Sequence, residues 1–192
     1  MASPDYVPGL SELSLRPDDL ALQRSARLLL LLEVARGTKL KKALDVERLG
    51  YYDFFAANPF ALFAREEREG KEIVLAGFSS HDLSYQSSGH RFVTRRGRLQ
   101  ADLAYLVARA LVEAAADSEA RRVVYQLTEK GLDAAHRFVS IYAQSYRASV
   151  GHVLKRLDRL SDSALVREVR TRLEATGQLI DLYGFETEEP GT

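Results

Sequence analysis

Four arginines lie within eight residues of this 192-residue chain and could together bind a charged ligand. Arg91, Arg95, Arg96 and Arg98 lie in the segment RFVTRRGR, which contains no acidic residue. A guanidinium group can hold a phosphate through two parallel hydrogen bonds, and the amides at a helix N-terminus also favour an anion. We therefore expect phosphate contact here. The alternative is a solvated basic face, or an ion-pair surface for an acidic partner.

Three further arginines extend this predicted surface. Arg109 shares a face of the predicted helix with Arg98, whereas Arg121 and Arg122 come just before a predicted strand. The latter two either reach the DNA backbone or protect an edge strand by their charge. Asp102 lies one turn beyond Arg98, where a carboxylate tends to pair with an arginine and repels phosphate. This mixed face argues against direct reading of bases.

The histidines are the conventional candidates for metal binding or acid–base chemistry. His81 and His90 have a spacing that matches no zinc signature. His136 and His152 differ by roughly 160° around a helix, so they cannot share an ion. The chain has no cysteine, which excludes thiolate zinc sites, disulfides and a cysteine nucleophile. Without a phosphate-binding glycine loop, a nucleophile elbow or a carboxylate pair, we predict a protein that is not an enzyme and has no catalytic residue, metal or cofactor.

The composition limits what the protein can bind. The chain has 27 Lys and Arg residues and 27 Asp and Glu residues, so attraction to nucleic acid depends on a local patch. A hydrophobic fraction of 46% predicts one globular domain or two very small ones. The longest apolar run, Leu28 to Leu32, is far shorter than the roughly 20 residues that span a bilayer, and the start lacks a signal-peptide pattern. We expect a cytoplasmic protein without membrane contact.

The first half of the chain predicts helices and one short strand. Helices are expected at 17–36 and 46–57, the second capped by Asp45 and stopped by Pro59. Aromatic residues gather between Tyr51 and Phe63, where we predict core rather than a ligand pocket. A strand at 73–78 and an exposed polar loop at 79–90 follow.

A basic amphipathic helix is predicted from Thr94 through the alanine-rich segment to 117. Its apolar positions follow helical spacing: Leu99, Leu103, Leu106, Ala110 and Ala114. The run RRVVYQL predicts a half-buried strand, with Val123, Tyr125 and Leu127 on one side. Thr128 is expected to cap the next helix.

The strongest periodic signal is an apolar stripe that predicts one long helix over about 129–160. Such a stripe requires a partner helix or another subunit. We predict that it binds a partner through six residues: Val139, Tyr142, Tyr146, Val150, Val153 and Leu157. Packing inside the chain, against the 17–36 helix and the last helix, is the open alternative. The last helix is capped by Ser161 or Ser163, carries Val166, Val169, Leu173 and Ile180 on one face, and folds back to complete a long helical hairpin.

The succession of helix, strand and Thr-capped helix between residues 94 and 145 is the layout of a winged helix. The run RRVVYQLTEKGLDAAHRF resembles the wing strand and following helix of winged-helix proteins, and LDRLSDSALVREVRTRLE is similar to the end of MarR-type regulators. This resemblance implies a mainly α fold with a small β wing. It also supplies the main rival hypothesis for function, a homodimeric MarR-type transcription regulator that binds operator DNA.

A second resemblance covers more of the chain. The segments KALDVERLGYYDFFAANPFALF, RRGRLQADLAYLVARALV and VVYQLTEKG resemble, in that order, the middle component of bacterial ABC three-component systems, a group that includes Lamassu-type defence. It implies a non-catalytic accessory subunit that bridges an SMC-like ABC ATPase and an effector nuclease, acting against phage or plasmid DNA. Non-specific contact with double-stranded DNA is a further expectation. A third hypothesis is an adaptor whose winged helix binds protein and no DNA.

The predicted organisation follows from these elements. It comprises a flexible arm (1–15), a winged-helix-like domain (16–128), a long helical hairpin that packs on that domain or on a partner (129–183), and an acidic tail (184–192).

Overall fold

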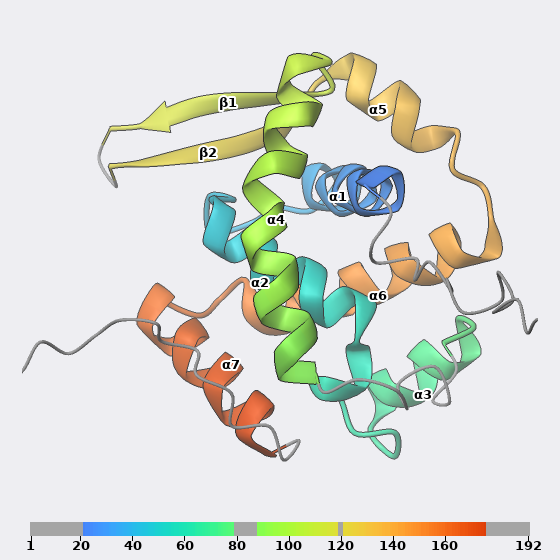
Figure 1. The fold of residues 1–192 in the computed structure, drawn as a ribbon. Helices are drawn as coiled ribbons and strands as arrows, with labels where there is room; N and C mark the ends of the chain where they lie inside the picture. The colour runs from blue at the N-terminus through green and yellow to red at the C-terminus, as the bar shows by residue number, and fades with distance from the viewer. Residues whose placement is uncertain (1–20, 79–87, 119–120, 176–192) are drawn as a thin grey trace, which may run out of the picture.

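The computed structural model describes residues 21–78, 88–118 and 121–175, with the side chains of 88–97 and 174–175 left out of the description. The described part is mainly helical and has one small antiparallel sheet, as predicted (Figure 1). Its elements in chain order are α1 (Ala21–Arg36), α2 (Val46–Ala57), the 3₁₀ turn η3 (Pro59–Ala61), α3 (Arg68–Leu75), α4 (Ser88–Ala108), β1 (Val112–Asp117), β2 (Arg122–Leu127), α5 (Glu129–His136), α6 (Ile141–Leu157) and α7 (Asp162–Ala175). The predicted N-terminal arm, the acidic tail, and most of the predicted 79–90 loop lie outside the described residues.

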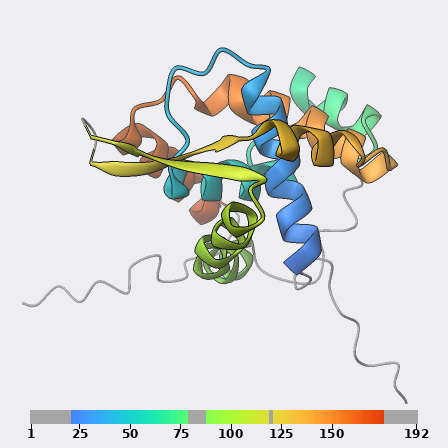
Figure 2. The same ribbon diagram turned by 90° about the horizontal axis from the view of Figure 1, so that it is seen from above.

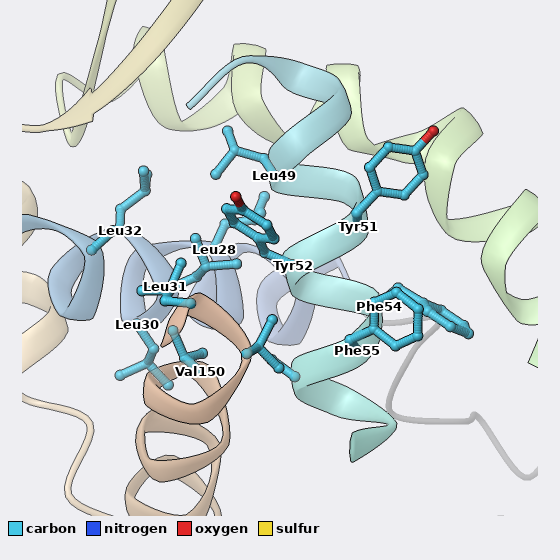
Figure 3. Packing of buried hydrophobic residues seen from close by; sticks show 14 of the residues in the cluster. Leu28, Leu30, Leu31, Leu32, Leu49, Tyr51, Tyr52, Phe54, Phe55 and Val150 are labelled. Carbon is cyan, nitrogen blue, oxygen red and sulfur yellow. The ribbon is translucent and has the colours of Figure 1, made fainter. Parts of the chain in front are cut away.

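Helix α1 forms the centre of the fold, surrounded by other elements (Figures 1 and 2). It contacts α2, α4, α5, α6 and β2. Its five consecutive leucines, Leu28 to Leu32, are all buried, because a helix that is apolar on every side must be covered on every side. Figure 3 shows Leu28 of this run beside Tyr52 of α2, and Leu30 beside Val150 of α6.

Helix α2 has the predicted bounds. Asp45 caps its start by accepting a 2.8 Å hydrogen bond from the Arg48 amide. Asn58 ends it, and the side-chain amide of Asn58 donates to the Phe54 carbonyl oxygen at 2.9 Å. The aromatic residues of this region are core, as predicted, with Phe54 and Phe55 in an edge-to-face pair 5.2 Å apart.

The alanine-rich segment after α4 is a strand, so its predicted helical conformation is wrong. Helix α4 ends at Ala108, and Ala110 has a φ of 55°, which a continuing right-handed helix does not allow. Strand β1 then pairs antiparallel with β2, with Val112 opposite Leu127. The hydrogen bonds and cross-strand contacts of this pairing override the helical preference of alanine.

Strand β2 lies where the sequence predicts it, but its inward side differs. Val124 and Leu127 are buried, Tyr125 is half-buried, and Val123 is exposed. β2 also has a second backbone neighbour besides β1 at this point, because Asp45 forms an isolated antiparallel bridge with Val124. The predicted alternation therefore fails, since the segment before α2 covers part of the strand.

The predicted strand at 73–78 is wrong: residues 68–75 form α3. Only Ile73 and Gly70 are buried in this helix, and its glutamates, lysine and leucine are good helix formers. The two strands of the described part pair with each other, so a strand here would have had no neighbour for its backbone hydrogen bonds.

The single helix predicted over 129–160 is also wrong, because it is divided into α5 and α6. Ser140 caps α6 by accepting a hydrogen bond from the Ala143 amide at 3.2 Å. The Arg147 guanidinium donates to the carbonyl oxygens of Ala135 and Phe138, at 2.9 and 2.8 Å, and so satisfies the end of α5. The apolar period continues across the break because both helices turn their apolar sides toward α1.

Helix α7 begins where predicted, with Ser161 accepting a hydrogen bond from the Ala164 amide at 3.3 Å. Leu165, Val169 and Leu173 are buried, whereas Val166 is exposed, so the buried face is shifted from the predicted one. Ile180 of the predicted face lies outside the described residues. Thr128, as predicted, caps α5 by accepting a hydrogen bond from the Gly131 amide at 2.9 Å.

We predict that Gly131→Ala destabilises the protein, although alanine is the better helix former. A Cβ at Gly131 would lie 2.0 Å from the Leu111 carbonyl oxygen, a backbone atom that cannot move aside. The free energy of unfolding should fall by about 1–3 kcal/mol, as for an overpacked core. In Gly151→Ala, the matched control, the new Cβ meets nothing within 4 Å, and stability should rise by up to about 1 kcal/mol. Urea unfolding followed by circular dichroism measures both, and equal midpoints for the two variants would contradict the prediction.

Candidate functional site

The predicted phosphate-binding arginines divide into described and undescribed groups. Arg91, Arg95 and Arg96 lie within α4, but their side chains are outside the described residues. Arg98 is exposed further along the same helix, and Arg109 is exposed in the turn just after it. The Arg109 guanidinium lies 5.0 Å from the centre of the Tyr105 ring, a cation–π contact that holds Arg109 against the end of α4.

Two charged residues of the predicted surface are engaged within the chain. Arg122 lies 2.7 Å from Asp45 and 3.3 Å from Asp162. It therefore forms ion pairs within the chain that link β2 to the segments before α2 and at the start of α7. Asp102 is buried and accepts two hydrogen bonds from Arg24 of α1, at 2.7 and 3.0 Å. Asp102 thus pairs with an arginine as expected, but that arginine belongs to α1 and not to the helix of Asp102 itself. Arg121, beside the strand, is exposed and has a φ of 51°.

A group of charges joins α2, β2 and the start of α7, and we call it the charged junction: Asp45, Arg48, Arg122, Asp158 and Asp162. Arg48 is its centre, with a side chain only 1% exposed. Its guanidinium donates to the Tyr52 hydroxyl and the Leu160 carbonyl oxygen at 2.8 Å each, and to Asp162 at 3.0 Å. Every side of this buried cation therefore has an acceptor.

The electrostatics of the charged junction favour its ionised form. Burial by itself lowers the pKa of the Arg48 guanidinium, but its interactions with Asp162 and Tyr52 outweigh burial and raise that pKa. The hydrogen bond from Arg48 in turn lowers the pKa of the Asp162 carboxyl. Asp158 completes the junction by accepting the backbone amides of Lys41 and Lys42, at 2.7 and 3.3 Å. The junction fixes elements in place, and its spacing in sequence gave no signal by which we could predict it.

Four of the six predicted partner-binding residues belong to the core of this chain. Tyr146, Val150, Val153 and Leu157 are fully buried, and α6 packs on α1 and α2. For these four, the structure corrects the expectation of a partner surface, and packing inside the chain is the alternative that holds. Tyr146 also donates a 2.6 Å hydrogen bond to Asp53, and burial followed by the nearby Asp53 charge raises its pKa well above the ordinary value, so it stays protonated.

The other two residues of the stripe lie on an exposed apolar surface. We call it the apolar α3–α6 face, and it consists of Val74, Leu75, Val139, Ile141 and Tyr142. These are five of the nine large hydrophobic side chains that are exposed in the described part of the chain. Leu75 is 87% exposed, Ile141 79% and Val139 73%.

The two halves of the apolar α3–α6 face are held together by α3 lying beside α6 (Figure 1). The Ser145 hydroxyl donates to the Ala76 carbonyl oxygen at the end of α3. A Cβ built on Gly77 would lie 3.8 Å from the Ile141 side chain, which places the end of α3 against the start of α6. Leu75 and Ile141 were not predicted from the sequence, because neither falls in a periodic stripe.

A groove of about 540 Å³ opens between the end of α1, the α1–α2 connection and β2. Two basic and two acidic residues line it, and of these Arg36 and Glu129 form an ion pair with each other. The groove thus has no excess of either charge. Among the described residues, no group of three or more His, Cys, Asp and Glu side chains could hold a metal ion. No helix of the described part is both long and apolar enough to cross a membrane.

Comparison with protein families decides the class of the protein. The family model described as ABC-three component (ABC-3C) system Middle Component 2 matches residues 20–178, which span every described helix and strand. The chain belongs to this family. The predicted middle component of an ABC three-component defence system is therefore confirmed, and such a component acts with the other components of its system. Neither the curated proteins nor the solved structures contain a match to this middle component.

We predict that Asp162→Asn lowers stability at neutral pH and not at acidic pH. The pKa of Asp162 is lowered in the folded state, so the charged carboxylate stabilises the fold above the pKa of an unfolded carboxyl, about 4. This stabilisation is lost as the pH falls through the lower folded pKa. The side chain is 66% exposed, and solvent screening limits the effect to about 1 kcal/mol or less.

The measurement is urea unfolding across this pH range, with Asp133→Asn, an exposed carboxylate of α5, as the control. A difference between Asp162→Asn and the wild type that stays constant as the pH falls would contradict the prediction.

Proposed function

We propose that this middle component is a non-catalytic accessory subunit that docks on the SMC-like ABC ATPase of its system through the apolar α3–α6 face. Bridging from that ATPase to an effector nuclease is part of the same proposal. The observation that carries it is the face itself, because it gathers five of the nine exposed large hydrophobic side chains of the described part on two adjoining segments, and exposed apolar patches mark interaction sites.

The face is held rigidly, which favours binding. The Ser145 hydroxyl has both the Ala76 carbonyl oxygen of the α3 end and the Ile141 carbonyl oxygen of the first α6 turn within hydrogen-bonding distance, and its single proton serves these two acceptors. Tyr142 stacks on the buried Tyr146 ring, with centroids 6.2 Å apart. A preorganised surface loses little conformational entropy on association, and an exposed aromatic side chain is a common binding anchor.

The ATPase is the occupant to which we commit. Family membership supplies partners within one system, and that system is named for its ABC component. The exposed side chains are uncharged, so the matching surface on the ATPase must be apolar as well. Val139 and Tyr142 retain the partner-binding role predicted from the sequence. Leu75 and Ile141 join them in this proposal.

We also propose that α4, β1, β2 and α5 form a winged-helix unit that serves protein assembly. The antiparallel β1–β2 hairpin follows α4 and leads into the Thr128-capped α5, which supports the assignment. Arg122 of the hairpin is tied to Asp45, and Asp102 of α4 is tied to Arg24. With these groups occupied, the unit is poorly suited to read base edges.

The proposal predicts that Leu75→Ser combined with Ile141→Ser weakens capture of the ATPase by at least about tenfold, since interface anchors in the centre of a patch dominate affinity. Both side chains are exposed, so the variant should fold as the wild type does. The measurement is co-purification of the ATPase with the tagged full chain after co-expression of all components of the system.

The matched control is Leu22→Ser combined with Val123→Ser, which removes two exposed hydrophobic side chains elsewhere on the molecule. Equal capture by both double variants would refute the docking face. A stable homodimer of the free chain that the Leu75 and Ile141 changes dissociate would assign the face to a second copy and also refute it. The docking proposal would also be refuted if the Leu75 and Ile141 changes removed the effector from the purified complex but left the ATPase bound.

A further inference from the structure

A second basic surface lies where the α1–α2 connection passes the end of α6. We call it the α6 basic face, and it consists of Lys39, Lys41, Lys42, Lys155, Arg156 and Arg159. The two segments are adjacent because the backbone amides of Lys41 and Lys42 donate to Asp158 at the end of α6. Figure 2 shows the connection, in light blue, running alongside this end of α6, in orange. None of these six residues belongs to the arginine surface predicted from the sequence.

The cations of this face are exposed enough to contact a ligand, although the Arg159 guanidinium also donates a 3.1 Å hydrogen bond to the Lys155 carbonyl oxygen. Five of the six side chains are exposed, and Lys42 is half-buried. The carboxylates beside them are already engaged: Asp158 accepts two backbone amides, and Asp162 is paired with Arg48. Further away, the pKa of Glu72 is lowered first by its hydrogen bond from Arg68 and to a smaller extent by Lys155. The result is a local excess of positive charge in a chain whose total charge is zero.

Stabilisation of the C-terminal end of α6 explains only some of the cations in the α6 basic face. Lys155 and Arg156 lie in the last turn of α6, where cations offset the partial negative charge of the free carbonyls. The lysines of the connection come from another segment, and the charge of Lys42 contributes to lowering the pKa of the Asp162 carboxyl. Backbone amides alone hold this segment to Asp158, so the lysine side chains are not needed for that contact.

The chemistry of the α6 basic face favours a polyanion over a protein as its ligand. Segments 37–45 and 151–161 contribute none of the exposed large hydrophobic side chains in the described part, and Leu40 and Leu160 pack against the core. Protein interfaces depend on apolar and aromatic anchors, whereas contact with a phosphate backbone requires cations alone. Base stacking on single strands requires exposed aromatic rings, and these two segments contain none.

We propose that the α6 basic face binds the phosphate backbone of a nucleic-acid duplex without reading its sequence. A duplex presents about one negative charge per 1.7 Å of its axis, so several cations in one surface release several counterions on binding. The proposed apolar docking face lies at the opposite end of α6, so the two surfaces share no residue. The inference goes beyond the docking proposal and does not depend on it, because the free chain should bind the duplex.

The test is fluorescence anisotropy with the full chain and labelled DNA and RNA duplexes of about 30 base pairs, together with the single DNA strand, across a salt series. In the test variant, Lys41, Arg156 and Arg159 are all changed to Gln. Its duplex affinity should fall at least about tenfold at low salt, and the slope of log affinity against log salt should decrease by about 2–3. Circular dichroism confirms that the Lys41→Gln, Arg156→Gln, Arg159→Gln variant folds.

The matched control changes three exposed cations elsewhere, Lys71→Gln, Lys130→Gln and Arg137→Gln, and so removes the same charge. It should keep its duplex affinity within about twofold, because backbone contacts act locally. The DNA or RNA duplex that binds more tightly to the wild type identifies the source of the phosphate.

Several results would overturn the inference. These are the absence of duplex binding by the wild type at low salt, tighter binding of the single strand, and equal losses in the test and control variants. A loss confined to Arg98→Gln, Arg109→Gln, Arg121→Gln would move the site to α4 and the strands. If the test variant kept its duplex affinity but no longer captured a protein component, the face would be a protein site.

Discussion

The need to cover α1 on all sides organises the whole molecule. Its central leucines leave no face for solvent, so α2, α4, α5, α6 and β2 must all contact it. Hydrophobic burial is non-directional and does not decide which element takes which side of α1.

The charged residues of α1 specify which element packs on which side. Arg24 pairs with Asp102 of α4, Arg27 lies 3.6 Å from Asp53 of α2, Glu33 pairs with Arg147 of α6, and Arg36 pairs with Glu129 of α5. Each ion pair joins α1 to a different helix. Such pairs add little net stability where they are buried, and specifying the arrangement is a role that suits them.

Helix α6 then connects the core to both proposed surfaces. Its middle is buried against α1 and α2, its first turn carries Ile141 and Tyr142 of the apolar α3–α6 face, and its last turn carries part of the α6 basic face. The two surfaces differ in chemistry because the neighbouring segments differ: α3 contributes hydrophobic side chains, and the α1–α2 connection contributes lysines. The two proposed surfaces thus lie at opposite ends of one helix of this middle component. The charged junction keeps β2, α2 and α7 in register beside it.

Family membership identifies the chain as one component of a three-component system. The sequence resemblance to the middle component of ABC three-component systems rests on aromatic and leucine-rich segments, and these are the segments that build the core around α1 and α2. The resemblance therefore reflects the residues that build the core and not those proposed to bind partners. The residues proposed to bind partners lie mostly outside those segments, on α3, the α1–α2 connection and the two ends of α6. For the same reason, the family match is compatible with either outcome for the predicted α4 arginines.

Local signals in the sequence determined the elements whose ends depend on neighbouring residues. Asp45 and Pro59 fixed α2, Thr128 fixed the start of α5 and Ser161 that of α7, because capping and proline act within one turn of the chain. Tertiary structure decided the rest. Residues 112–117 form a strand only because β2 lies beside them, and the predicted helix over 129–160 divides where Arg147 reaches the end of α5 and Glu33. An apolar stripe has the same period whether it faces its own core or a partner. Only the packing of α6 on α1 and α2 could show that Tyr146, Val150, Val153 and Leu157 are core, while exposure revealed Leu75 and Ile141.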